Sequence, residues 1–135
     1  MEPINGLYGF LYDENGQQVQ LTQEFDSDLD YNKETYTVPG KFLKSHKVTG
    51  GEASGSFTIL KTDSRLQKKI AENPHGKYNY VGKLADPTAN GEEAILFIGV
   101  SFDGTKLLNY NVEEFVELDF DFTFDDFRFL QTIDG

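Results

Sequence analysis

Apolar and polar residues alternate most clearly near the C-terminal end of the chain, between residues 117 and 124. The apolar positions are Leu118, Phe120, Phe122 and Phe124, and the polar positions between them are Glu117, Asp119, Asp121 and Thr123. Successive side chains of a strand point to opposite faces, so this pattern predicts a β-strand with one apolar and one acidic face. Burial should contribute roughly 1.5–3 kcal/mol per apolar side chain, which places the strand in the core. The acidic row repels itself and is favoured only in water or beside positive charge.

A second alternation covers residues 25–31 and predicts a strand whose acidic face is formed by Asp26, Asp28 and Asp30. Residues 7–12 and 17–22 read as an antiparallel hairpin around Asn15-Gly16. Residues 54–61 and 78–84 are further expected strands, and the continuous apolar run 94–102 is typical of a central strand covered on both faces.

One helix is expected after residue 61. Thr62 or Asp63 can cap it, Leu66 and Ile70 lie one turn apart on its buried side, and Asn73-Pro74 ends it. Six to eight strands plus this helix predict an α+β domain that is mainly β, an antiparallel sandwich or barrel with one short flanking helix. At 135 residues, the chain has the size of one domain.

Residues 32–51 lack a clear alternation. They contain Pro39-Gly40, with Lys41, Lys44, His46 and Lys47 nearby. We interpret them as an irregular connection of about 20 residues, which is long for a compact domain and usually functional or ordered by a partner. Residues 85–93 are expected to form a surface loop.

The charge is unevenly distributed along the chain. The net charge of −11 divides into −7 over residues 1–40, +6 over 41–83 and −10 over 84–135. Either the fold mixes these segments into an ordinary solvated surface, or copies assemble with unlike faces in contact. The acidic total argues against nucleic-acid binding by phosphate neutralisation. No apolar run approaches the ~18 residues of a membrane helix, so no membrane segment is expected.

The candidate metal and phosphate sites lack the residue types that the known motifs require at fixed positions. Residues 26–30 open like a calcium loop, but Tyr31 stands where Gly is needed and Thr37 where Glu is needed. The glycines of residues 50–55 lack the Lys-Ser/Thr pair of a phosphate loop. His46 and His75 lie 29 residues apart without a second histidine nearby, and there is no cysteine, so no metal or cofactor is expected.

Catalysis by Asp119 and Asp121 would require one carboxyl with a raised pKa in an apolar pocket. Their acidic neighbours indicate an open, wet surface instead, so we do not expect an enzyme. Three tyrosines, Tyr78, Tyr80 and Tyr110, could alternatively form a sugar-binding platform.

Two blocks carry a family resemblance. The first is His46-Lys-Val-Thr-Gly50 followed by Gly55-Ser-Phe-Thr-Ile-Leu-Lys61; the second is Ala94-Ile-Leu-Phe-Ile-Gly-Val-Ser-Phe-Asp103, continuing through Val112-Glu-Glu to Phe122-Thr-Phe-Asp-Asp-Phe127. Together they resemble the tail tube (core tail) proteins of contractile-tailed phages, PBSX-like prophages and phage-tail-like bacteriocins, over about residues 20–130.

This resemblance implies a structural protein that forms hexameric rings stacked into a hollow tube inside a contractile sheath. The implied partners are further copies of the chain, the sheath protein, and baseplate and tape measure proteins, with DNA present only in transit. The implied location is a virion tail or phage-tail-like particle assembled in the bacterial host cytoplasm. The alternative is a monomeric β-sandwich binding module for a carbohydrate or a protein partner.

The resemblance also assigns candidate sites. The candidate lumen-facing residues are Glu117, Asp119, Asp121, Thr123, Asp26, Asp28 and Asp30; alternatively, these carboxylates face the outside of the tube or a subunit seam. The candidate contacts between rings are Pro39, Gly40, Lys41, Lys44, His46 and Lys47.

Overall fold

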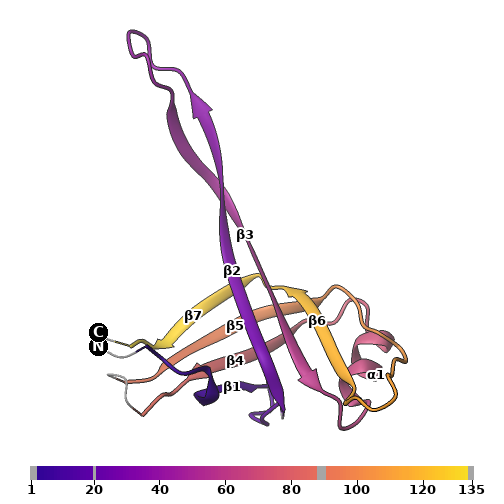
Figure 1. Cartoon of the computed structure of the whole chain (residues 1–135). Helices are drawn as coiled ribbons and strands as arrows, with labels where there is room; N and C mark the ends of the chain where they lie inside the picture. The colour runs from indigo at the N-terminus through magenta and orange to yellow at the C-terminus, as the bar shows by residue number, and fades with distance from the viewer. Residues whose placement is uncertain (1–2, 20, 88–90, 134–135) are drawn as a thin grey trace.

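Seven strands and one α-helix make up the described part of the chain, residues 3–19, 21–87 and 91–133, in the computed structural model (Figure 1). In chain order, the elements are a 3-10 turn at Gly6–Tyr8, β1 (Gly9–Tyr12), β2 (Thr22–Tyr36), β3 (Ser45–Leu60), α1 (Arg65–Glu72), β4 (Tyr78–Leu84), β5 (Glu93–Phe102), β6 (Glu117–Thr123) and β7 (Asp126–Gln131). The mainly β architecture with one short helix confirms the expected fold class. Within the described ranges, no helix is long and apolar enough to cross a membrane.

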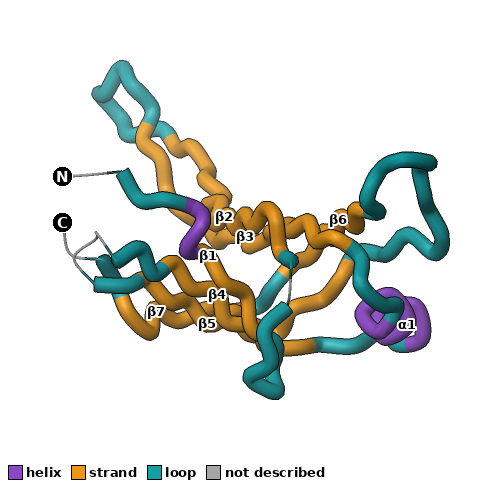
Figure 2. The backbone as a smooth tube through the Cα atoms, turned by 60° about the horizontal axis from the view of Figure 1, so that its bottom comes forward, coloured by secondary structure: helices purple, strands orange, loops and turns teal. Residues whose placement is uncertain are grey.

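All strand pairs are antiparallel, in the order β1-β4-β5-β6-β3-β2, with β7 also paired to β5. The result is two layers, one formed by β1, β4, β5 and β7 and the other by β2, β3 and β6 (Figure 2). Strand β5 joins them, because its last residues, Ser101 and Phe102, leave β7 and pair with β6. Gly99 permits this change of partner with a φ of 70°, a conformation that side chains with a Cβ rarely adopt.

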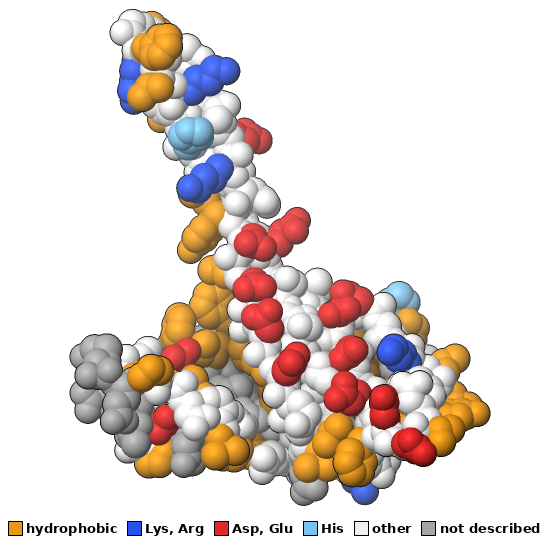
Figure 3. Space-filling model, viewed as in Figure 1, with side chains coloured by type: hydrophobic (Ala, Val, Ile, Leu, Met, Phe, Trp, Pro, Cys, Tyr) orange, Lys and Arg blue, Asp and Glu red, His pale blue; other side chains and the backbone are white. Residues whose placement is uncertain are grey.

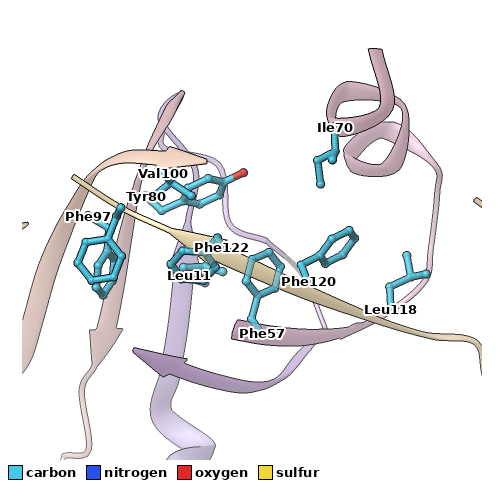
Figure 4. Packing of buried hydrophobic residues seen from close by; sticks show 10 residues of the cluster. Leu11, Phe57, Ile70, Tyr80, Phe97, Val100, Leu118, Phe120 and Phe122 are labelled. Atoms are coloured by element: carbon cyan, nitrogen blue, oxygen red, sulfur yellow. The ribbon is translucent and has the colours of Figure 1, made fainter. Parts of the chain in front are cut away.

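The core lies between the two layers (Figure 4). Phe57 and Phe120 contribute from one layer, and Tyr80, Phe97 and Val100 from the other. The apolar positions predicted for the C-terminal strand are all buried, so the prediction of a core strand is confirmed; the residues are Leu118, Phe120, Phe122 and Phe124. The strand itself ends at Thr123, and β7 begins a new pairing with β5 at Asp126.

Strands β2 and β3 pair far beyond the core and form a long hairpin, which projects from the body (Figure 1). The prediction of an irregular connection over residues 32–51 is therefore wrong. Residues 32–36 continue β2, residues 45–51 begin β3, and only residues 37–44 connect them. The pattern is weak here because both faces of the hairpin are exposed, so no apolar alternation is needed and the strands are held by the backbone hydrogen bonds between them.

The expected N-terminal hairpin is only partly correct. The turn exists, with Gly16 at a φ of 77° and the Asp13 carboxylate accepting the N–H groups of Asn15 and Gln17. Among the described residues after the turn, Gln18 forms an isolated bridge with Tyr12 rather than a strand, and Thr22 already begins β2. Strand β1 pairs with β4 instead.

The expected helix is confirmed, with a small correction to its capping residue. The loop that follows β4 also differs from its prediction. Ser64 is its N-terminal cap residue, while the Asp63 carboxylate accepts the N–H of Arg65. Ile70 is buried and Leu66 half-buried, as expected. In the expected surface loop 85–93, Asp86 is buried and accepts the N–H of Asn5, and residues 88–90 lie outside the described part.

Candidate assembly interface

The topology brings the two predicted acidic rows onto one face. Strand β3 lies between β2 and β6, and Ser56 pairs with Asp26 on one side and with Asp121 on the other. Paired residues of antiparallel strands point to the same side, so the carboxylates of β2 and β6 share a surface. We call this surface the acidic face; its carboxylates are Glu24, Asp26, Asp28, Asp30, Glu52, Glu117, Asp119 and Asp121.

Two members of the acidic face, Glu24 and Glu52, were not among the residues predicted from sequence. Glu24 pairs with Thr58, and Glu52 pairs with Asp30. The alternation of Asp26, Asp28 and Asp30 extended by one step would have included Glu24. Glu52 could not be placed because the start of β3 is exposed on both faces and its sequence shows no alternation.

Between the acidic rows, β3 supplies short polar side chains, including Ser54 and Ser56, and Thr123 of β6 lies opposite Ser54. Thr58 Oγ1 donates a hydrogen bond of 2.6 Å to Asp119 Oδ1. Among the described residues, no carboxylate of the acidic face forms an ion pair. Neighbouring carboxylates along one strand lie about 7 Å apart, so the face is a self-repelling surface that disfavours anions.

The acidic face does not have the form of an active site. Asp119 and Asp121 are exposed rather than held in an apolar pocket. In the described ranges, no cluster of three or more potential metal ligands is present. The arrangement can therefore exclude like charge from a surface, which is a different task from holding a reacting group.

The second feature of the candidate interface is the projecting hairpin segment, residues 32–51, which we call the arm. Residues 37–44 form its tip. Figure 3 shows Lys side chains together with apolar side chains around the tip, and acidic side chains along the base of the arm and the adjoining sheet. All the candidate contact residues lie exposed on the arm; they are Pro39, Gly40, Lys41, Lys44, His46 and Lys47. Sequence reasoning missed Phe42, which is 98% exposed. An exposed ring at the end of an arm is a signal for an interface.

The three tyrosines do not form a sugar-binding platform. Tyr80 is buried against Phe102, and burial, aided by the nearby Asp13 and Glu14 carboxylates, raises the pKa of its hydroxyl above the ordinary value. Tyr78 also packs against Phe102, while Tyr110 is exposed in the separate loop between β5 and β6. Packing in the core explains two of the three aromatic positions.

Comparison with known proteins identifies the class that this fold and surface represent. The family model described as phage tail tube protein matches residues 1–131, so the chain belongs to the phage tail tube protein family. This confirms the family resemblance seen in the sequence.

A relative and two solved structures agree with this assignment. The chain is 26% identical over 137 residues to the phage-like element PBSX protein XkdM of Bacillus subtilis (strain 168), covering 92% of this chain and 88% of that protein. Its fold is similar to a chain of the sheath-tube complex of the extracellular contractile injection system PVC, with a TM-score of 0.76, 8% identity, and coverage of 96% of this chain and 93% of that one. It is also similar to a chain in the tail of an empty gene transfer agent particle with C6 symmetry, with a TM-score of 0.62, 10% identity, and coverage of 96% and 100%.

Proposed function

We propose that six copies of this tail tube chain form a ring and that rings stack into a hollow tube inside a contractile sheath. The tube conducts DNA in a phage or acts as the puncturing tube of a phage-tail-like bacteriocin. The similar chains in a sheath-tube complex and in a C6-symmetric tail support this proposal. In this role, the chain is non-enzymatic, and residues 1–135 act as one tube domain. Its further partners are baseplate and tape measure proteins. The chain is assembled in the host cytoplasm and is located in a virion tail or a phage-tail-like particle.

The acidic face is the observation that carries the proposal. Strand β6 buries one side in the core and exposes the other, which is the requirement for a wall facing a water-filled bore. Carboxylates on such a wall repel DNA phosphates, whereas a basic wall would hold DNA through counterion release. We therefore assign Asp26, Asp28, Asp30, Glu117, Asp119, Asp121 and Thr123 to the bore, together with Glu24 and Glu52.

Ring closure and stacking account for two further features. Strands β1 and β2 are the two ends of the strand order, and each leaves an unpaired edge in the isolated subunit. Pairing or covering these edges between neighbours in a closed ring removes a liability to uncontrolled aggregation. The arm projects beyond the body and, in this proposal, contacts the next ring.

The proposal is tested by negative-stain electron microscopy and light scattering of the purified chain over a range of concentrations. Six-fold rings or hollow tubes are expected. A matched variant replaces residues 33–48 by an Asn-Gly turn, which leaves the paired body of β2 and β3 in place. This variant should keep its circular dichroism spectrum and form rings without tubes. A wild-type chain that stays monomeric at all concentrations, even with a baseplate extract, would contradict the proposal.

A further inference from the structure

A second exposed apolar surface lies in the loop between β5 and β6, residues 103–116. Phe115 is 87% exposed and Val112 is 82% exposed, and Leu107, Leu108 and Tyr110 are also exposed. Apolar side chains gathered in this way on one loop indicate a surface that another molecule covers. The core of the subunit does not need them, since its buried cluster contains none of these five residues.

The base of this loop contains a pocket of about 520 Å³, which we call the loop pocket. Its apolar lining includes Leu60, Tyr110 and Phe115. Its acidic lining consists of Glu113, Glu114, Glu117 and Asp119. The volume falls within the range of about 300–1,000 Å³ typical of binding pockets, and the pocket combines apolar surface with negative charge.

The loop pocket is held in shape by hydrogen bonds at both ends of the loop. Gln67 Nε2, from α1, donates to the Lys106 carbonyl oxygen at 2.7 Å. At the other end, the N–H of Lys61 donates to the Val116 carbonyl oxygen at 2.8 Å, and Asn109 Nδ2 donates to the Glu117 carbonyl oxygen at 3.2 Å. A pocket fixed in the free subunit loses little conformational freedom when it is filled.

Two local features are unfavourable in the isolated subunit. Asn109 Oδ1, at the pocket, is buried and has no hydrogen-bond donor among the described residues. Glu113 has a φ of 72°, a left-handed conformation that is uncommon for a residue with a long side chain. Such features cluster where a surface is shaped for binding.

The arm tip has the complementary chemistry. Phe42 and Leu43 are exposed apolar residues, and Lys41 and Lys44 flank them. The distal arm, residues 33–48, carries four Lys and one Glu, whereas residues 103–119 carry five carboxylates and one Lys. The acidic face also attracts lysines, but the β3 positions between its carboxylates are Ser54, Ser56 and Thr58, which offer no apolar site for Phe42. The apolar β3 residue in register with Glu117 is Leu60, and it lines the loop pocket.

The tip and the loop pocket lie at opposite ends of strand β3. Its first residue, Ser45, adjoins the tip, and its last residue, Leu60, lines the pocket. Sixteen residues of strand span about 50 Å, so a tip cannot reach the pocket of its own subunit. A copy displaced along this direction brings the two surfaces together, and the same contact can then repeat without limit.

We infer that the arm tip of one subunit docks into the loop pocket of a copy in the adjacent ring. Phe42 and Leu43 cover Tyr110 and Phe115, and Lys41 and Lys44 face Glu113 and Glu114. This inference rests on the proposed tube function, and it names the partner surface of the arm.

A disulfide trap tests the contact directly, because the chain has no native cysteine. Phe42→Cys combined with Tyr110→Cys is expected to give covalent ladders longer than dimers when tubes are oxidised. The control combines Phe42→Cys with Leu7→Cys. Leu7 is 74% exposed and Tyr110 is 73% exposed, so random collision would affect both equally. Since a disulfide needs Cα atoms within about 7 Å, only the Tyr110 pair should form ladders.

Charge exchange provides a second test. Lys41→Glu with Lys44→Glu, and separately Glu113→Lys with Glu114→Lys, should each raise the protein concentration needed for tube formation about tenfold. Combining all four changes should restore assembly to within about threefold of wild type. Lys68→Glu, an exposed position on α1, serves as the control and should leave assembly unchanged.

The outcomes distinguish a failure of the docking inference from a failure of the proposed function. Tubes that form normally but give no Phe42–Tyr110 ladder, or an equal ladder with Leu7, overturn the docking inference and leave the proposed function standing. A quadruple variant that assembles no better than either charge reversal also overturns it. A wild-type chain that forms neither rings nor tubes overturns the proposed function itself.

Discussion

Replacement of Asp26 by Asn should stabilise the isolated subunit, because this residue lies within the acidic face. Glu24 and Asp28 flank it on β2, and Asp121 lies across β3 on the same side. The two neighbours on its own strand are about 7 Å away, and Asp121, two strands away, is about 10 Å away. Asn keeps the shape of the side chain and removes its charge.

The expected gain follows from Coulomb's law. Two charges about 7 Å apart in water repel by about 0.6 kcal/mol, and two about 10 Å apart by about 0.4 kcal/mol. Screening in 10 mM salt leaves roughly three-quarters of each value, so removal of the Asp26 charge relieves at most about 1.2 kcal/mol. In 1 M salt, the relief falls to about 0.1 kcal/mol. These are upper limits, because the unfolded chain keeps part of the repulsion between near neighbours.

Urea unfolding in 10 mM and 1 M salt, at protein concentrations below assembly, measures the difference in the free energy of unfolding. Glu34→Gln is the matched control, since Glu34 lies opposite the cation Lys47 in the β2–β3 register of the arm, and removal of its charge should give no gain. An Asp26→Asn variant that shows no gain in 10 mM salt, or the same gain in 1 M salt, would refute the reasoning that the acidic face repels itself.

Three further predictions concern the core. Phe120→Ala should lower the free energy of unfolding by about 3–5 kcal/mol in urea titration, because Phe120 is buried, whereas Phe42→Ala at the exposed tip should change it by less than about 0.5 kcal/mol. Gly55→Ala should cost about 1–3 kcal/mol in the same assay, since its Cβ would lie 2.5 Å from Phe122 Cζ. The raised pKa of Tyr80 keeps its hydroxyl protonated in the folded state, so the contribution of Tyr80 to stability should be constant below about pH 10 and be lost as the pH rises above it.

Each of these three predictions has its own control or contrary result. A small loss for Phe120→Ala would mean that the ring is not part of a packed core. A neutral Gly55→Ala variant would mean that the Phe122 ring of β6 can move aside without cost. Tyr80→Phe should flatten the alkaline decline measured by thermal unfolding at pH 9–11; an unchanged decline would assign it to other groups.

The parts of the fold that could be predicted from the sequence are those in which apolar side chains are buried. Residues 117–124 alternate between apolar and polar positions, and the structure buries their apolar side in the core. The helix around Ile70 was predicted from its own apolar period, whereas residues 94–102 were predicted as a strand covered on both faces because they form a continuous apolar run. In each case, burial of apolar side chains determined the local structure and left a recognisable pattern in the sequence.

The arm could not be predicted because its two strands are held together by backbone hydrogen bonds and not by buried side chains. Residues 32–51 are almost entirely exposed, and backbone hydrogen bonds leave no trace in the order of side chains. The residue pattern predicts the two rows of acidic residues separately, and only the family resemblance groups them as lumen-facing. Their position on one face depends on β3 lying between β2 and β6. That strand order follows from long-range packing, which a local pattern does not contain. The loop pocket was missed because its exposed apolar residues follow no period.

The most direct test of the tube assignment is a cryo-electron microscopy reconstruction of the assembled wild-type protein. The proposed function predicts a six-fold hollow tube in which Asp26, Asp28 and Asp121 face the central bore. A tube that places these carboxylates on its outer surface, or buries them between subunits, would contradict the central claim that the acidic face lines the conduit.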